Sequence, residues 1–142
     1  MKTSLTVVLR HKIKQFNKSI NVDPDKSLSI RSFLIGSISQ GISTASNILE
    51  SEDVKNTITV CKKLGVKIKK IKPKIYRIYG NGLGSLYLKK QTELNFGNSG
   101  TASRLMIGIL STTPNIQVRI KGDHSLNRRS MGKLIDLMEK FG

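Results

Sequence analysis

The apolar positions of this chain follow a helical spacing in some stretches and a strand-like spacing in others. Apolar residues recur every three or four positions in the stretches 33–41, 54–65, 105–110 and 131–141. Continuous apolar runs or alternating apolar and polar residues, which are typical of strands, occupy 16–22, 42–49, 66–71, 75–79 and 116–120. Helices and strands therefore succeed one another along the chain, and this order predicts an α/β fold.

The second half of the pattern resembles the first. Arg31 and Arg104 each stand four residues after a small residue, Ser27 or Gly100, and each precedes an apolar helical run. The apolar spacing of 54–65 is also matched by that of 131–142. We expect one unit of alternating strands and helices built twice, with two helix N-termini facing one cleft. A chance likeness between amphipathic helices is the alternative.

Residues 94–104 form a glycine-punctuated turn that leads into the apolar stretch 105–110. We expect several backbone N–H groups to be free at this helix N-terminus, where the helix dipole adds partial positive charge. Arg104 lies one turn into the helix and can add a bidentate guanidinium. The turn therefore predicts a pocket for phosphate or carboxylate. The alternative is an ordinary helix start that uses glycine for the turn.

A second loop, 122–131, connects a predicted strand to a predicted helix and contains the adjacent pair Arg128 and Arg129. Two neighbouring arginines attract anions, although such a pair is also common at solvated corners. His124 lies in the same loop without an obvious partner, so nothing in the sequence assigns it to acid–base chemistry.

The charge of +16 suggests a nucleic-acid partner, but the composition argues against one. Lysine supplies 18 of the 25 basic residues, whereas phosphate and base recognition favour arginine, and stacking aromatics are few. The single cysteine, Cys61, allows neither an internal disulfide nor a cysteine metal cluster, and its helical position predicts a buried thiol. No stretch is long enough to span a membrane, and the apolar patch 5–9 is too short for a signal peptide. We therefore expect a cytoplasmic protein without nucleic-acid or membrane partners.

Three segments carry a resemblance to a known family. They are 25–31 (DKSLSIR), 97–105 (GNSGTASRL) and 122–129 (GDHSLNRR). In this order they resemble the motifs of the EPSP synthase family, one of the enolpyruvyl transferases, and the likeness runs from about 16 to 142. Two positions depart from the family pattern. Asp23-Pro24 replaces a proline-glycine pair, and Ser130 replaces the proline that usually follows the arginine.

The resemblance implies transfer of the enolpyruvyl group of phosphoenolpyruvate to the 5-hydroxyl of shikimate 3-phosphate, without a metal or organic cofactor. It also implies repeated βαβαββ units of the enolpyruvyl transferase fold. By resemblance, Lys26 touches both substrates, Ser27 and Arg31 hold shikimate 3-phosphate, and Gly100 and Arg129 hold phosphoenolpyruvate. Asn98, Thr101 and Arg104 are expected to shape and support the loop around Gly100.

Family members are much longer than this chain and place the active site between two domains. We therefore expect residues 1–142 to be the N-terminal portion of an incomplete first domain, inactive alone, in a full-length monomer. One alternative is the related UDP-N-acetylglucosamine enolpyruvyl transferase, which has lysine-asparagine where this chain has Lys26-Ser27. The alternative from another class is a small basic nucleic-acid-binding protein.

Overall fold

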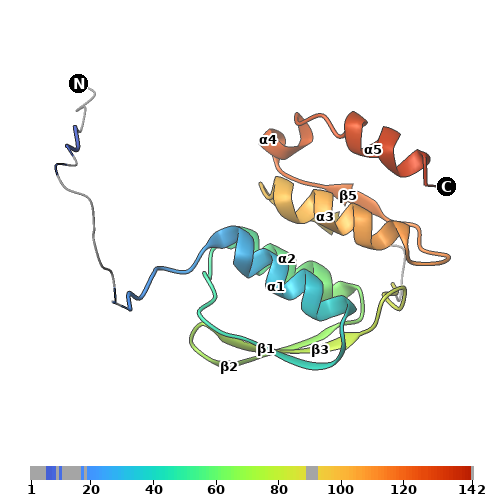
Figure 1. Cartoon of the computed structure of the whole chain (residues 1–142). Helices are drawn as coiled ribbons and strands as arrows, with labels where there is room; N and C mark the ends of the chain where they lie inside the picture. The colour runs from blue at the N-terminus through green and yellow to red at the C-terminus, as the bar shows by residue number, and fades with distance from the viewer. Residues whose placement is uncertain (1–5, 9, 11–16, 18, 89–92, 142) are drawn as a thin grey trace.

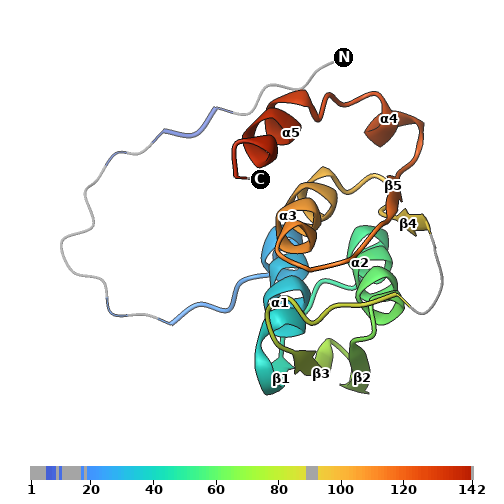
Figure 2. The same cartoon turned by 90° about the vertical axis from the view of Figure 1, so that its right-hand side faces the viewer.

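The computed structural model of the chain describes residues 6–8, 10, 17, 19–88 and 93–141, and Figures 1 and 2 show it from two sides. Two groups of helices and strands lie side by side and share one hydrophobic core. The first group comprises α1 (Lys26–Ile38), β1 (Gln40–Ala45), α2 (Glu52–Lys63), β2 (Lys67–Lys72) and β3 (Ile75–Asn81). The second comprises β4 (Glu93–Asn95), α3 (Gly100–Ser111), β5 (Arg119–Lys121), α4 (His124–Asn127) and α5 (Gly132–Glu139).

The first group is an antiparallel sheet with α1 and α2 against one face (Figure 2). The strands lie in the order β1-β3-β2, and Ile68 of β2 is opposite Ile78 of β3. Because side chains alternate between the two faces of a strand, these isoleucines are buried while Lys67 and Lys69 are exposed. The half-buried, lysine-rich strand predicted at 66–71 is therefore confirmed.

The second group contains a parallel pair, β4 and β5, connected through α3. Helix α3 packs against α1, and buried residues of both groups form a single cluster around Phe33, Leu94, Phe96 and Met106. The chain is therefore an α/β protein, as its sequence pattern predicts. The two halves are only partly alike, because the antiparallel sheet of the first group has no counterpart among the described residues of the second.

Helices α1, α2 and α3 begin at the same end of the molecule, on the left of Figure 1, where α4 also lies. A side chain caps the first turn of three of these helices. Asp25 accepts from the Leu28 N–H (2.7 Å), Ser99 from the Ala102 N–H (3.2 Å) and Asp123 from the Leu126 N–H (2.8 Å). The positive ends of several helix dipoles therefore gather in one region.

Several predicted boundaries were wrong. Helix α1 ends at Ile38 rather than near Gly41, because Gln40 and Gly41 already pair with β3. Strand β1 ends at Ala45, and two residues later Asn47 has a positive φ of 54° that extended chain does not allow. The strand predicted at 116–120 is reduced to Arg119–Lys121, and α5 is shorter than the predicted helix 131–141. Of the strand predicted at 16–22, residues 16 and 18 lie outside the described residues, and the others form no strand.

Candidate anion-binding site at the helix N-termini

The turn before α3 is held by hydrogen bonds to its own side chains. Gly97 has a φ of +57°, which glycine adopts without strain, and its N–H donates to Asn95 Oδ1 over 2.9 Å. The N–H of Gly100 donates to the Asn98 carbonyl over 3.0 Å, and Ser99 Oγ occupies the N–H of Ala102. The expectation of several free N–H groups was therefore wrong. Within the described chain, the N–H groups of Asn98 and Thr101 are the two left without a protein acceptor between Phe96 and Ser103.

Gly100, the first residue of α3, is buried beneath two guanidinium groups. A Cβ built on this glycine would lie 2.9 Å from Arg129 Nη1 and 3.0 Å from Arg104 Nη1. Two like charges therefore approach one point on the backbone, from two different elements. Gly100 does not have a positive φ. Glycine is therefore needed here for the space that it leaves to the two guanidinium groups, and not for its backbone freedom.

Both guanidinium groups are held by neutral oxygen atoms. Arg104 Nη2 donates to the Ser130 carbonyl over 3.3 Å, and Arg129 Nη2 donates to Asn98 Oδ1 over 2.8 Å. Within the described part of the chain, neither arginine forms an ion pair with a carboxylate. Their positive charges are oriented but not neutralised, and an anion of the solvent or a substrate is the natural counter-charge.

Main-chain hydrogen bonds bring the two loops of this site together. The N–H of Phe96 donates to the Lys121 carbonyl over 2.9 Å, and the N–H of Asp123 donates to the Gly97 carbonyl over 2.8 Å. The Asn127 amide closes the second loop by bonding both the N–H and the carbonyl of Gly122. Consequently Arg129, and not its neighbour Arg128, contacts Gly100.

Lys26 begins α1 and forms an ion pair with Asp53 in the first turn of α2, with 2.9 Å between Nζ and Oδ2. Asp53 was not among the predicted site residues, and its contact with Lys26 is evident only in the structure. The sequence did not indicate that Asp53 pairs with Lys26, because the two residues belong to different helices. The other two predicted site residues of α1 are Ser27, which is half-buried, and Arg31, which is exposed.

The structure does not bring every predicted residue into one cluster. Arg31 lines a groove between α1 and β1 with Ser32, Ser43 and Thr44, and this groove includes none of the residues around Gly100. The predicted residues that do meet are Asn98, Gly100, Arg104 and Arg129, with Thr101 in the same first turn of α3.

The two departures from the family motifs are accommodated locally. No residue from 19 to 26 has a positive φ, and the Asp25 carboxylate caps α1 directly after Pro24. Ser130 supplies the carbonyl that holds Arg104, and its Oγ accepts from the Gly132 N–H over 3.3 Å. Neither departure removes a group that holds the two arginines.

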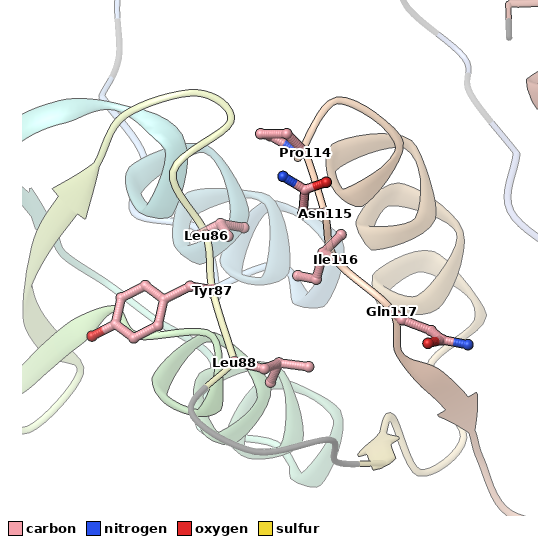
Figure 3. Close-up of a pocket in the computed structure, with 7 residues that line it drawn as sticks. All are labelled: Leu86, Tyr87, Leu88, Pro114, Asn115, Ile116 and Gln117. Atoms are coloured by element: carbon pink, nitrogen blue, oxygen red, sulfur yellow. The ribbon is translucent and has the colours of Figure 1, made fainter.

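A separate cavity of about 350 Å³ lies between the segments 86–88 and 114–117, as Figure 3 shows. These segments follow β3 and α3, beside the last turns of the helices rather than their first turns. All seven lining residues are uncharged: Leu86, Tyr87, Leu88, Pro114, Asn115, Ile116 and Gln117. This cavity therefore lacks the charge that would hold a phosphate or carboxylate.

The described residues contain no group of three or more histidine, cysteine, aspartate or glutamate side chains placed to hold a metal ion. None of the helices in the described ranges combines the length and the apolar character needed to cross a bilayer.

The chain is similar to EPSP synthases in both sequence and structure. The family profile of EPSP synthase (3-phosphoshikimate 1-carboxyvinyltransferase) matches residues 10–142. The 3-phosphoshikimate 1-carboxyvinyltransferase of Leptospira interrogans is 39% identical over 131 residues, which are 92% of this chain and 30% of that protein. The protein of the same name from Oceanobacillus iheyensis is 41% identical over 124 residues, or 87% of this chain and 28% of the relative.

A solved EPSP synthase from Acinetobacter baumannii superimposes with a TM-score of 0.78 and 33% identity, covering 87% of this chain and 27% of the other. The α/β arrangement described above is therefore part of the fold of EPSP synthases, the enolpyruvyl transferase fold. The chain spans about 30% of the length of the curated relatives it matches. Since the profile runs through both loops around Gly100 and through all the described helices, this chain belongs to the EPSP synthase family.

Proposed function

We propose that this chain binds phosphoenolpyruvate and shikimate 3-phosphate as part of a 3-phosphoshikimate 1-carboxyvinyltransferase, an enzyme of aromatic amino-acid biosynthesis in the cytoplasm. Membership of the EPSP synthase family supports the reaction, and the site at α3 supports the binding of an anionic substrate. The observation that carries the proposal is the convergence of Arg104 and Arg129 on Gly100 without a carboxylate partner.

In the proposed reaction the 5-hydroxyl oxygen of shikimate 3-phosphate bonds to C2 of phosphoenolpyruvate while a proton adds to C3. The tetrahedral intermediate then loses inorganic phosphate and a proton from C3, which restores the double bond. Both substrates carry a phosphate and a carboxylate, so their approach brings several negative charges together. Fixed cationic groups lower the cost of that approach and of the charge on the departing phosphate.

The proposal assigns the described residues to binding rather than to proton transfer. Arg129 and the backbone at Gly100 receive phosphoenolpyruvate, and Asn98, Thr101 and Arg104 maintain the shape of that loop. Lys26 contacts both substrates, and Ser27 and Arg31 hold shikimate 3-phosphate. Arg31 lines a different groove from the surface around Gly100, and Lys26 is the residue assigned to both substrates.

Two measurements test the proposal. The first titrates phosphoenolpyruvate and shikimate 3-phosphate separately into the 142-residue chain, followed by isotope-edited NMR. We expect phosphoenolpyruvate to shift signals of residues 98–104 and 129, and shikimate 3-phosphate to shift those of 26–31. UDP-N-acetylglucosamine serves as the competing substrate, and its selective binding at 26–31 would favour the related cell-wall enzyme instead.

The second measurement fuses the chain to the complementary C-terminal part of the Leptospira interrogans relative and follows phosphate release. We expect release only when both substrates are present. Equal release without shikimate 3-phosphate would contradict the assignment. Salt-sensitive retention of the unfused chain on DNA, with no response to either substrate, would favour a nucleic-acid-binding protein.

A further inference from the structure

A chain of hydrogen bonds links the Asp123 carboxylate to the Arg129 guanidinium. Arg129 Nη2 donates to Asn98 Oδ1 over 2.8 Å, and Asn98 Nδ2 donates to Asp123 Oδ2 over 2.8 Å. The other oxygen of Asp123 accepts from the Leu126 N–H over 2.8 Å and caps α4. The two carboxylate oxygens therefore have different partners and can be tested separately.

Asn98, the residue between Asp123 and Arg129, can satisfy both hydrogen bonds in only one orientation of its side-chain amide. The Asn98 side chain has one accepting oxygen and one donating –NH₂ group. An ionised carboxylate can only accept, so Asp123 selects the orientation that turns the –NH₂ group toward it. The Asn98 oxygen then necessarily faces Arg129, whose guanidinium can only donate.

Asp123 is suited to this task because it stays ionised. Hydrogen bonds from the Leu126 N–H and from Asn98 hold the pKa of its carboxyl below the ordinary value. The carboxylate nevertheless forms no ion pair with Arg129 within the described structure. An intervening amide orients the guanidinium but leaves its positive charge available, whereas a carboxylate in direct contact would compete with an anionic ligand.

We propose that Asp123 is a positioning residue for phosphoenolpyruvate binding, which acts through Asn98 to hold the Arg129 guanidinium over Gly100. The role of Arg129 in binding rests on the function proposed above. The fixed orientation of the guanidinium does not rest on that function, because it follows from hydrogen bonds within the chain.

The discriminating variant is Asp123→Asn. Its single side-chain oxygen can still cap α4, but its –NH₂ group then faces Asn98. If Asn98 reorients to accept from this group, it turns its own –NH₂ toward Arg129, and two donors oppose each other. We expect the variant to keep its helices while the guanidinium of Arg129 loses its fixed partner.

Two companion variants separate positioning from a general loss of structure. Asp25→Asn makes the same substitution at the other aspartate cap, which holds the Leu28 N–H at the start of α1. The double variant Asn98→Asp with Asp123→Asn places a carboxylate where it can accept from both Arg129 and the new amide at 123. This double variant should restore the fixed guanidinium, although it also neutralises its charge.

The direct readout is the set of guanidinium NMR signals of Arg129 in the 142-residue chain without ligand, assigned with Arg129→Lys. We expect separate, slowly exchanging Nη signals in the unsubstituted chain and in Asp25→Asn. They should be averaged in Asp123→Asn and separate again in the double variant. Signals that are already averaged in the unsubstituted chain, or unchanged in Asp123→Asn, would overturn the proposal.

The second readout is the dissociation constant of phosphoenolpyruvate. We expect Asp123→Asn to raise it about five- to tenfold, less than the loss of a whole charge-assisted hydrogen bond because the Arg129 charge remains, and Asp25→Asn to leave it within about twofold. If phosphoenolpyruvate does not bind the unsubstituted chain, the proposed function fails, while the guanidinium signals still decide whether Asp123 fixes Arg129 through Asn98. If it binds equally well to Asp123→Asn, the positioning role fails and the proposed function stands.

Discussion

Lys26 and Asp53 form an ion pair that connects the first turn of α1 to the first turn of α2. The lysine side chain is 53% exposed and that of the aspartate 15%. Water therefore screens one end of the pair, and its contribution to stability is small. Its effect is to hold the ammonium group near the helix N-termini, where the proposed substrates carry their charge.

A double-mutant cycle measures this pair. We expect Lys26→Ala, Asp53→Ala and the double variant to give a coupling energy of at most about 1 kcal/mol in urea unfolding. A coupling energy above about 2 kcal/mol would mean that the pair is a structural anchor between the two helices, contrary to our interpretation.

Gly100→Ala should separate binding from stability. The new Cβ would lie within about 3 Å of two guanidinium ends, which can move aside because they are the tips of flexible side chains. We expect unchanged or slightly higher stability, weaker binding of phosphoenolpyruvate and, in the fused enzyme, a higher apparent KM for phosphoenolpyruvate. Gly108→Ala in the same helix is the matched control, since its Cβ meets nothing within 4 Å. It should raise stability by about 0.5–1 kcal/mol and leave binding unchanged.

The adjacent arginines should differ in their effect on binding. Arg129 lies beside Gly100 and bonds Asn98, whereas Arg128 is an exposed residue at the end of α4. We expect Arg129→Ala to weaken phosphoenolpyruvate binding at least about tenfold, as the loss of a charged donor does, and Arg128→Ala to weaken it far less. Equal losses in the NMR titration would show that general charge, rather than position, governs this loop.

Glu50 should make stability depend on pH in acid. Hydrogen bonds from Lys70 and Tyr76 lower the pKa of its carboxyl from 4.5 to about 2. A carboxyl with a lowered pKa stabilises the folded state above its ordinary pKa and loses that contribution as the pH falls toward the folded value. We expect the urea midpoint of the unsubstituted chain to fall toward that of Glu50→Gln between about pH 4.5 and pH 2. A constant difference between the two midpoints across this range would contradict the assignment.

Cys61 should react only when the protein unfolds. The thiol is fully buried in α2, as its helical spacing predicts, and burial raises its pKa to about 11. We expect a thiol reagent at pH 8 to leave the folded chain unmodified and to react in proportion to the unfolded fraction in urea. The double variant Cys61→Ser with Thr59→Cys places a thiol on the exposed side of the same helix and should react at once.

Signals contained in a few neighbouring residues were readable from the sequence. The glycine-rich turn at 97–100 and the lysine-rich strand at 66–71 each depend on local backbone preferences or on a short alternation. The order of three motifs was sufficient to indicate the family. Strand ends were less predictable, because pairing partners and single positive-φ residues such as Asn47 determine where a strand stops.

The sequence by itself determined the α/β class, the start of α3 at a glycine turn and the presence of arginines near it. Only the tertiary structure decided that Arg104 and Arg129 converge on Gly100, that Asp53 holds Lys26, and that Arg31 faces another groove. The physical reason is separation along the chain. Asn98 is 31 residues from Arg129 and 25 from Asp123, and contacts over such distances depend on how the β4 and β5 loops are brought together rather than on any local preference.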